Sequence, residues 1–289
     1  MHLALINAHP RDARVHLIEE TRKLPGGKVI HVHYYLIDGE KYEKCSVSSL
    51  LEEFFPNKFD AVKASKGDVQ LQQMWKENGQ KAAEFGTMHH RHFENYLDQP
   101  DGLSDEEKLK NFEYNPDYPD YRSYTDLPAW DGFQYFLVTL EPYWKPFRVE
   151  WKVFSKTARL PGTIDLILRD MRYPDELRLM VVDYKINKEP LKIFCNCGAG
   201  KEETNAMKHK ENCPGVNAHP LTRHLLKTKV AKASAQTAVY ASLLIQLYNA
   251  NVVAGRLAYL HPEELPLFHD VDFETFLPLA QQMINSRVA

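Results

Sequence analysis

The length, composition and charge of the chain are close to the average for soluble globular proteins. It has 289 residues, 44% of them hydrophobic and 26% charged, and a net charge of −3 excludes a uniformly basic protein. No run of about 18 apolar residues occurs, so we expect no membrane span. The N-terminal residues lack a signal-peptide pattern and only four cysteines occur, so we expect an intracellular protein of the cytoplasm or nucleus.

The first half of the chain is predicted to be mostly helical after a hairpin. Residues His31–Tyr42 alternate in polarity and turn at an Asp-Gly pair, which indicates the hairpin. A short helix capped by Ser46 or Ser48 is expected through Leu50, Leu51, Phe54 and Phe55. A long helix is expected at Lys66–Leu97, where two internal glycines are possible breaks. The proline-containing stretch 98–128 indicates an irregular insertion.

The second half is predicted to contain a β-meander followed by helix, strand and helix. The expected elements are a helix at Trp130–Leu140, strands at Phe147–Phe154, Gly162–Leu168 and Leu177–Ile186, a helix at Leu225–Tyr248, a strand at Arg256–His261 and a helix at Phe273–Ile284. This order predicts a mixed α/β fold with a central mixed sheet flanked by helices.

Charged residues interrupt strands that otherwise have the composition of a protein core. Asp183 and Lys185 share one face of their strand, and Asp165 lies in the hairpin partner. Glu150 in the preceding strand could join them. Clustered carboxylates repel one another and lose hydration, and a divalent cation such as Mg²⁺ or Mn²⁺ relieves both costs. The alternative is a surface Asp183–Lys185 ion pair with Asp165 closing a turn.

These residues belong to motifs that resemble a known family. Gly162-Thr-Ile-Asp165 followed by Asp183-Tyr-Lys185 resembles the core of the PD-(D/E)XK nuclease superfamily, in its RecB-like exonuclease branch. Two further motifs of that branch have matches, Gly86-Thr-Met-His-His90 upstream and Gln236-Thr-Ala-Val-Tyr240 downstream. The resemblance spans residues 86–240 and keeps the order of the family.

The resemblance implies a role for each matching residue. Asp165 and Asp183 would ligate Mg²⁺ or Mn²⁺, and Lys185 would act on the nucleophilic water. His90 would be a further metal ligand, with His89 as the alternative if the helix register differs. The other residues that the resemblance places at the site are Glu150, which some relatives match with an acidic residue, Glu94 one turn after His90, and Gln236 and Tyr240 beside the nucleic-acid backbone.

The resemblance also implies a fold and an activity. We expect one nuclease domain with a restriction-endonuclease-like core that hydrolyses DNA, as an exonuclease acting on single strands or free ends. Its expected parts are an N-terminal hairpin and helix at 1–65, a helical arch or insertion at 66–140, a catalytic core at 147–261, a Cys/His insertion at 189–220 and a C-terminal helix at 262–289. The alternatives are a non-catalytic nucleic-acid-binding module and a viral-type RNA endonuclease.

A Cys/His cluster follows the Asp-x-Lys strand. Cys195, Cys197, His209 and Cys213 offer three thiolates and an imidazole, a set that suits a tetrahedral structural Zn²⁺. Three free cysteines in a loop are the alternative. Their position before the Gln-x-x-x-Tyr helix departs from relatives with an iron–sulfur cluster, so we expect no such cluster. Spare zinc ligands would be His219 and His224.

A basic segment follows the Cys/His cluster. No Asp or Glu occurs from Asn212 to Pro262. Such a segment in an acidic protein indicates a local anionic partner, although a solvated helix face is the alternative. We predict that nucleic-acid phosphates are contacted by Arg223, Lys227, Lys229 and Lys232.

Overall fold

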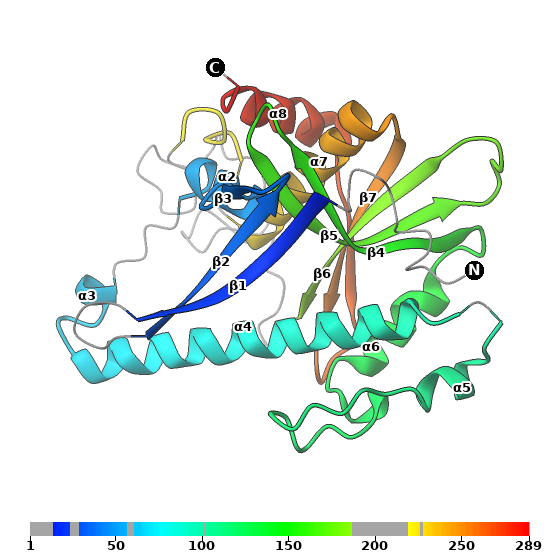
Figure 1. The fold of residues 1–289 in the computed structure, drawn as a ribbon, viewed down its shortest axis with the longest axis horizontal. Helices are drawn as coiled ribbons and strands as arrows, with labels where there is room; N and C mark the ends of the chain where they lie inside the picture. The colour runs from blue at the N-terminus through cyan, green and yellow to red at the C-terminus, as the bar shows by residue number, and fades with distance from the viewer. Residues whose placement is uncertain are drawn as a thin grey trace, which may run out of the picture.

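The computed structural model describes residues 14–23, 29–56, 61–100, 102–186, 219–225 and 228–288. Within these ranges the chain forms two β-sheets with helices around them (Figure 1). None of the described helices combines the length and apolar character needed to cross a membrane.

The N-terminal sheet has three antiparallel strands, β1 (Val15–Lys23), β2 (Val29–Ile37) and β3 (Glu40–Tyr42). The expected hairpin is present, and its turn residues Asp38 and Gly39 have φ values of 51° and 80°. Two positive φ values are typical of the tight turn that suits the right-handed twist of a hairpin. Strand β1 was not predicted, because its alternation ends in a charged Glu-Glu-Thr-Arg-Lys run.

The central sheet has five strands in the order β4-β5-β6-β7-β8. Strands β6 and β7 are parallel and every other neighbouring pair is antiparallel, so the sheet is mixed, as predicted. A parallel pair needs a crossover connection, and helix α7 (Lys229–Tyr248) lies within it. The strands are β4 (Trp144–Ser155), β5 (Leu160–Asp170), β6 (Arg178–Ile186), β7 (Asn251–Leu260) and β8 (Leu267–Asp270).

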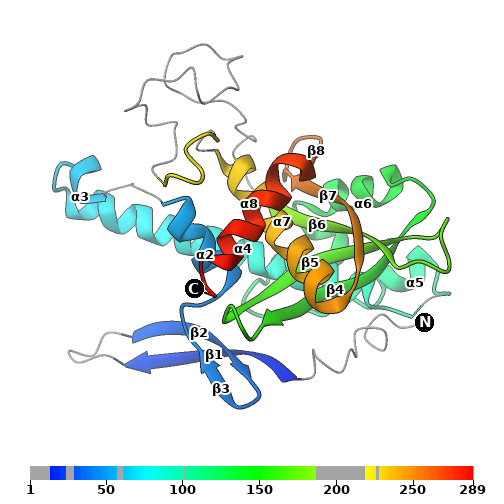
Figure 2. The ribbon, with the colours of Figure 1, turned by 90° about the horizontal axis from the view of Figure 1, so that it is seen from above.

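Helices cover both faces of the central sheet (Figures 1 and 2). Helices α2 (Val47–Phe54), α7 and α8 (Phe273–Asn285) pack on one face in a mainly aliphatic cluster. Helices α4 (Val69–Leu97) and α6 (Trp130–Thr139) pack on the other face in a cluster rich in aromatic rings. The two clusters give each face of the sheet its own core, as expected for an α/β layer structure.

Several element boundaries differ from the sequence prediction. Helix α4 continues through Gly79 and Gly86, where we expected possible breaks. Each glycine costs a helix interior only about 1 kcal/mol relative to alanine, which tertiary packing overrides. Helix α7 begins at Lys229 rather than at residue 225, because the Thr228 side chain accepts a hydrogen bond from the Ala231 N–H and caps the helix. Strand β8 is too short to show a periodic pattern.

The predicted irregular insertion at 98–128 contains short helices. Helix α5 (Asp105–Leu109) starts with a capping box in which Ser104 and Glu107 bond reciprocally. A 3₁₀ turn, η2, covers Tyr124–Asp126. Tyr124 is fully buried in the aromatic cluster, so this end of the insertion packs against the body of the protein. Outside this insertion, a further short helix, α3 (Ala61–Ala64), precedes α4.

Candidate active site

The site lies where strands β5 and β6 stop pairing. Their ladder joins residues Leu166–Arg169 to Leu179–Val182 and ends there. Beyond it the Tyr184 N–H donates to the Asp165 side chain, 2.9 Å from Oδ2. On its other edge β6 stays paired with β7 to the end of the strand. The sheet therefore opens on one side only, and a carboxylate replaces the missing backbone acceptor.

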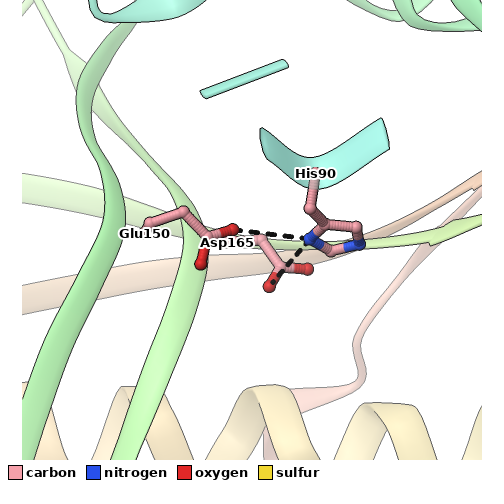
Figure 3. A group of neighbouring side chains, drawn as sticks. All are labelled: His90, Glu150 and Asp165. Carbon is pink, nitrogen blue, oxygen red and sulfur yellow. Dashed lines mark hydrogen bonds and ion pairs between the residues drawn. The ribbon is translucent and has the colours of Figure 1, made fainter. Parts of the chain in front are cut away.

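Three side chains from three different elements meet at this opening (Figure 3). His90 of α4 has Nδ1 3.4 Å from Oε1 of Glu150 in β4 and 3.6 Å from Oδ1 of Asp165 in β5. One donor atom from each residue lies within 4.8 Å of the others. The side chains of His90 and Glu150 are each 25% exposed, so solvent reaches the cluster. A single ion could contact all three groups.

The backbone of Glu150 is unusual for a strand residue. Its φ of 44° lies in the left-handed region, which costs a residue with a Cβ roughly 1–2 kcal/mol. Val149 packs in the aromatic cluster and Trp151 in the aliphatic one, although residues two apart in a regular strand share a face. The positive φ thus marks a reversal of the strand's facing at Glu150.

The same reversal occurs in the facing strand. Ile164 belongs to the aliphatic cluster and Leu166 to the aromatic one, so β5 changes its facing at Asp165. The register of the flanking pairs places Glu150 opposite Asp165. Like charges in facing positions destabilise a sheet. Strain and repulsion thus coincide at one point, which is typical of a functional site.

Asp183 and Lys185 form a close ion pair on β6. Lys185 Nζ lies 2.8 Å from Oδ1 and 2.6 Å from Oδ2 of Asp183. The Asp183 side chain is 4% exposed, so the pair is not the surface salt bridge that was the alternative interpretation. Tyr184 points to the other face and packs with the rings of Phe93 and Phe133, as strand alternation predicts.

The charges of the site perturb one another. Burial alone would lower the pKa of His90, but the carboxylates of Asp165 and Glu150 outweigh it and raise the pKa to about 9. Burial raises the pKa of Asp183 to about 6 against the opposing effect of Lys185. Burial also raises the pKa of Asp165, and the His90 charge opposes it. The cluster thus favours a positive charge, which is a proton on His90 when no metal is bound.

The structure also brings together the glycine and tyrosine of two motifs. A Cβ on Gly162 would lie 2.6 Å from Cε1 of Tyr240 and 2.9 Å from Cγ2 of Val47. Glycine therefore allows α7 and α2 to approach strand β5. Burial raises the pKa of the Tyr240 phenol well above the usual value; the charges of Asp165 and Asp183 add to the rise and a hydrogen bond with Gln236 opposes it. The Gln-x-x-x-Tyr motif hence packs beside the carboxylates.

The two adjacent histidines of α4 have different surroundings. His89 is fully buried, its Nδ1 lies 2.8 Å from the Phe85 carbonyl oxygen, and burial lowers its pKa to about 4. It packs against the rings of Phe85 and Phe93, whereas His90 meets the carboxylates. Glu94, one turn later, is half-buried; burial, with the nearby Glu150 charge, raises its pKa to about 7.

The predicted nucleic-acid contacts are only partly placed. Arg223 and Lys229 are exposed, while Lys232 forms an ion pair with Glu52. Lys229, Lys232, Gln236 and Tyr240 follow one stripe of α7 at spacings of three and four residues. The positions outside the described residues are Lys227 and the predicted zinc ligands Cys195, Cys197, His209 and Cys213.

The two spare zinc-ligand candidates, His219 and His224, both lie within the described residues. His219 lies against the Phe54 ring at 4.4 Å between centroids, so it packs on α2. His224 is exposed.

One residue beside the site was not predicted. Tyr35 of β2 places its hydroxyl 3.1 Å from Oγ1 of Thr163, two residues before Asp165. The hairpin pattern predicted a strand there but no partner for it. Nothing in the sequence relates this tyrosine to a strand 128 positions later.

Comparisons with known proteins add no family. No protein-family model matches the chain, and no curated protein matches it significantly. The basis for a function is therefore the geometry of the site and the order of its motifs.

Proposed function

We propose that the chain is a metal-dependent nuclease of the PD-(D/E)XK type, with a restriction-endonuclease-like core, that hydrolyses phosphodiester bonds of DNA. The observation that carries the proposal is the meeting of His90, Glu150 and Asp165 beside the Asp183–Lys185 pair. The RecB-like motif order favours an exonuclease acting on single strands or free ends. No separate observation favours another function.

The donor set of the site suits a hard divalent cation. Two carboxylates and an imidazole fit Mn²⁺, and the carboxylates fit Mg²⁺. A cation would offset the repulsion between Glu150 and Asp165. One oxygen of the neighbouring Asp183 carboxylate, Oδ2, is buried and accepts no well-aligned hydrogen bond, although the Lys185 ammonium lies beside it. His90, Glu150 and Asp165 would hold the ion, whereas Asp183, which the motif predicts as a ligand, is paired with Lys185. A bound ion polarises a phosphate and lowers the pKa of water.

The remaining residues of the site have roles that follow from their positions. The Lys185 ammonium, held by Asp183, orients the attacking water and balances the negative charge of the transition state. The Gln236–Tyr240 pair supports the strand that carries Asp165. The stripe of α7 that starts at Tyr240 continues to Lys232, which is paired with Glu52, and to the exposed Lys229, whose charge attracts the phosphate backbone.

The proposal is tested by digestion of end-labelled single- and double-stranded DNA with Mg²⁺ or Mn²⁺. We expect cleavage that EDTA abolishes and that Asp165→Asn removes, while the exposed control Glu264→Gln keeps the wild-type rate. An Asp165→Asn rate equal to that of wild type would contradict the proposal.

The same assay with other substrates separates the alternatives. An exonuclease digests linear single strands and leaves covalently closed circles of the same sequence intact. Rapid nicking of the circles would instead indicate an endonuclease. Cleavage of RNA alone would indicate the RNA endonuclease, and binding of either nucleic acid without cleavage would indicate a non-catalytic module.

A structural zinc ion remains a proposal from the sequence alone. Three thiolates and an imidazole would close the coordination sphere and leave no position for a reacting water. Elemental analysis of protein purified without added metal should find zinc, and Cys197→Ser should lose it. A brown protein that contains iron and sulfide would overturn the zinc assignment.

A further inference from the structure

Tyr35 reaches the site from a separate sheet. Strand β2 belongs to the N-terminal sheet, which lies beside the β4–β5 hairpin (Figure 2). The Tyr35 hydroxyl lies 3.1 Å from that of Thr163, in the strand that carries Asp165. We propose that this hydroxyl pair binds a phosphate oxygen of the substrate strand, next to the phosphate at the His90–Glu150–Asp165 cluster. The inference rests on the proposed nuclease function.

The position of Tyr35 does not depend on its own hydroxyl. The N-terminal sheet packs on the β4–β5 hairpin through a small core of Val15, Ile37, Tyr42 and Phe154, against which the Tyr35 ring packs. An ion pair, with a guanidinium nitrogen of Arg159 2.7 Å from Oε1 of Glu40, also joins the N-terminal sheet to the β4–β5 hairpin. Removal of the hydroxyl alone should therefore leave the ring and the sheet in place.

Hydrogen-bond accounting leaves one proton of the pair unused. Each hydroxyl carries one proton, and a single hydrogen bond between the two oxygens uses one of them. Neither hydroxyl makes another hydrogen bond to the part of the chain that the structure describes. Burial raises the pKa of Tyr35; the bond to Thr163 opposes this rise and the Glu150 charge adds to it, so the phenol stays a donor near neutral pH.

Charges of both signs lie near the hydroxyl pair: the Glu150 carboxylate raises the pKa of Tyr35, after the larger effect of burial, and Lys152 is a cation in the same sheet. Lys152 pairs with Thr163 in the β4–β5 ladder, and facing residues share one face of a sheet. Trp151 and Val153 pack in the aliphatic cluster, so strand alternation directs Lys152 between them to the opposite face, which α4 covers. A neutral donor and a cation beside a carboxylate cluster would suit a phosphate that flanks the one being cleaved.

The variant Tyr35→Phe tests the inference because it removes only the hydroxyl. Loss of a hydrogen bond to a charged group should raise KM for a labelled single strand about tenfold or more. The value of kcat, the melting temperature and the affinity for Mn²⁺ should stay near wild type. Tyr34→Phe is the matched control, because the alternation of β2 directs it to the opposite face. Thr163→Ser should keep the wild-type KM and Thr163→Val should raise it.

Two results would overturn the inference. One is an unchanged KM in Tyr35→Phe, and the other is a loss of stability and kcat with KM unchanged, which would indicate a structural role. Equilibrium binding of the same strand without metal separates this inference from the proposed function. Wild type that binds the strand but does not cleave it when Mg²⁺ or Mn²⁺ is added overturns the proposed nuclease. Weaker binding by Tyr35→Phe would then still support the hydroxyl pair. Wild type that neither binds nor cleaves overturns both.

Discussion

Strands β5 and β6 have two halves with opposite characters. In the paired half every ladder residue except Arg169 is apolar, and Leu166, Leu168, Leu179 and Val182 are fully buried. In the open half the same strands carry Asp165, Asp183 and Lys185. In the paired half, backbone N–H and C=O groups bond to each other across the ladder. In the open half, the Tyr184 N–H donates to the Asp165 carboxylate instead. Opening one side of the ladder thus admits charged groups into a protein core without leaving the Tyr184 amide unpaired.

The comparison separates stability from chemistry. Burial of the paired half stabilises the fold. The open half carries buried carboxylates and faces the strained Glu150 backbone of β4, and both features cost stability. Substitutions in the two halves should therefore have different effects, and the following changes test that difference.

The largest effect is expected for Asp165→Asn in the open half. Cleavage should fall about a hundredfold or more, because the charge is needed in the transition state. The amide oxygen can still accept the Tyr184 N–H bond, so thermal unfolding should stay near wild type. Lys185→Ala should lower the rate equally. Cleavage per folded molecule and the melting temperature check this, and rates near wild type for either variant would place the chemistry elsewhere.

Leu166→Ala in the paired half should have the reverse pattern. The lost burial and the cavity should lower the free energy of unfolding by about 2–5 kcal/mol. The cleavage rate per folded molecule should stay near wild type. Urea unfolding, with activity measured below the transition, checks this. A variant that is stable but inactive would show that the two halves are not separable.

The adjacent histidines of α4 sharpen the comparison within one helix. His90→Ala should weaken Mn²⁺ binding about tenfold or more, as removal of groups that hold a metal commonly does. His89→Ala should leave Mn²⁺ affinity near wild type and cost about 2 kcal/mol of stability, because it removes a buried ring. Calorimetric titration and urea unfolding measure the two effects. The reverse ranking of Mn²⁺ affinities would make His89 the ligand.

The smallest effect concerns the backbone of Glu150. Glu150→Gly and Glu150→Gln both remove the carboxylate, but only glycine accepts the positive φ without strain. We expect Glu150→Gly to be the more stable variant by about 1 kcal/mol, and both to lose Mn²⁺ affinity. Urea unfolding of the pair checks the difference. A more stable glutamine variant would mean that this backbone conformation is not strained.

Part of this site could be predicted from local patterns. Alternation in β6 put Asp183 and Lys185 on one face, away from Tyr184, and the structure agrees. Strands β4, β5 and β6 were expected within about three residues of their bounds, because apolar runs bounded by turns are strong local signals. Strand β7 begins earlier than the predicted Arg256, at Asn251, and β8 was not predicted. The mixed sheet with flanking helices follows from the order of those elements.

The rest of the site depends on features that local patterns do not contain. The register places Glu150 opposite Asp165 at a point where both strands reverse their facing, and strict alternation does not predict such a reversal. The choice of His90 over His89 depends on the rotation of α4, which its packing on the sheet determines. Tyr35 reaches Thr163 through the docking of a separate sheet. Each of these is a tertiary contact between distant segments.

Titration of metal-free protein with Mn²⁺, followed by electron paramagnetic resonance, is the most direct test of the central claim. The open half of β5 and β6 is predicted to hold the cation, so wild type and the control Glu264→Gln should bind Mn²⁺ with equal affinity. Asp165→Asn should lose that site while it remains folded by circular dichroism. Equal binding by wild type and Asp165→Asn, or no Mn²⁺ binding by folded wild type, would contradict the claim.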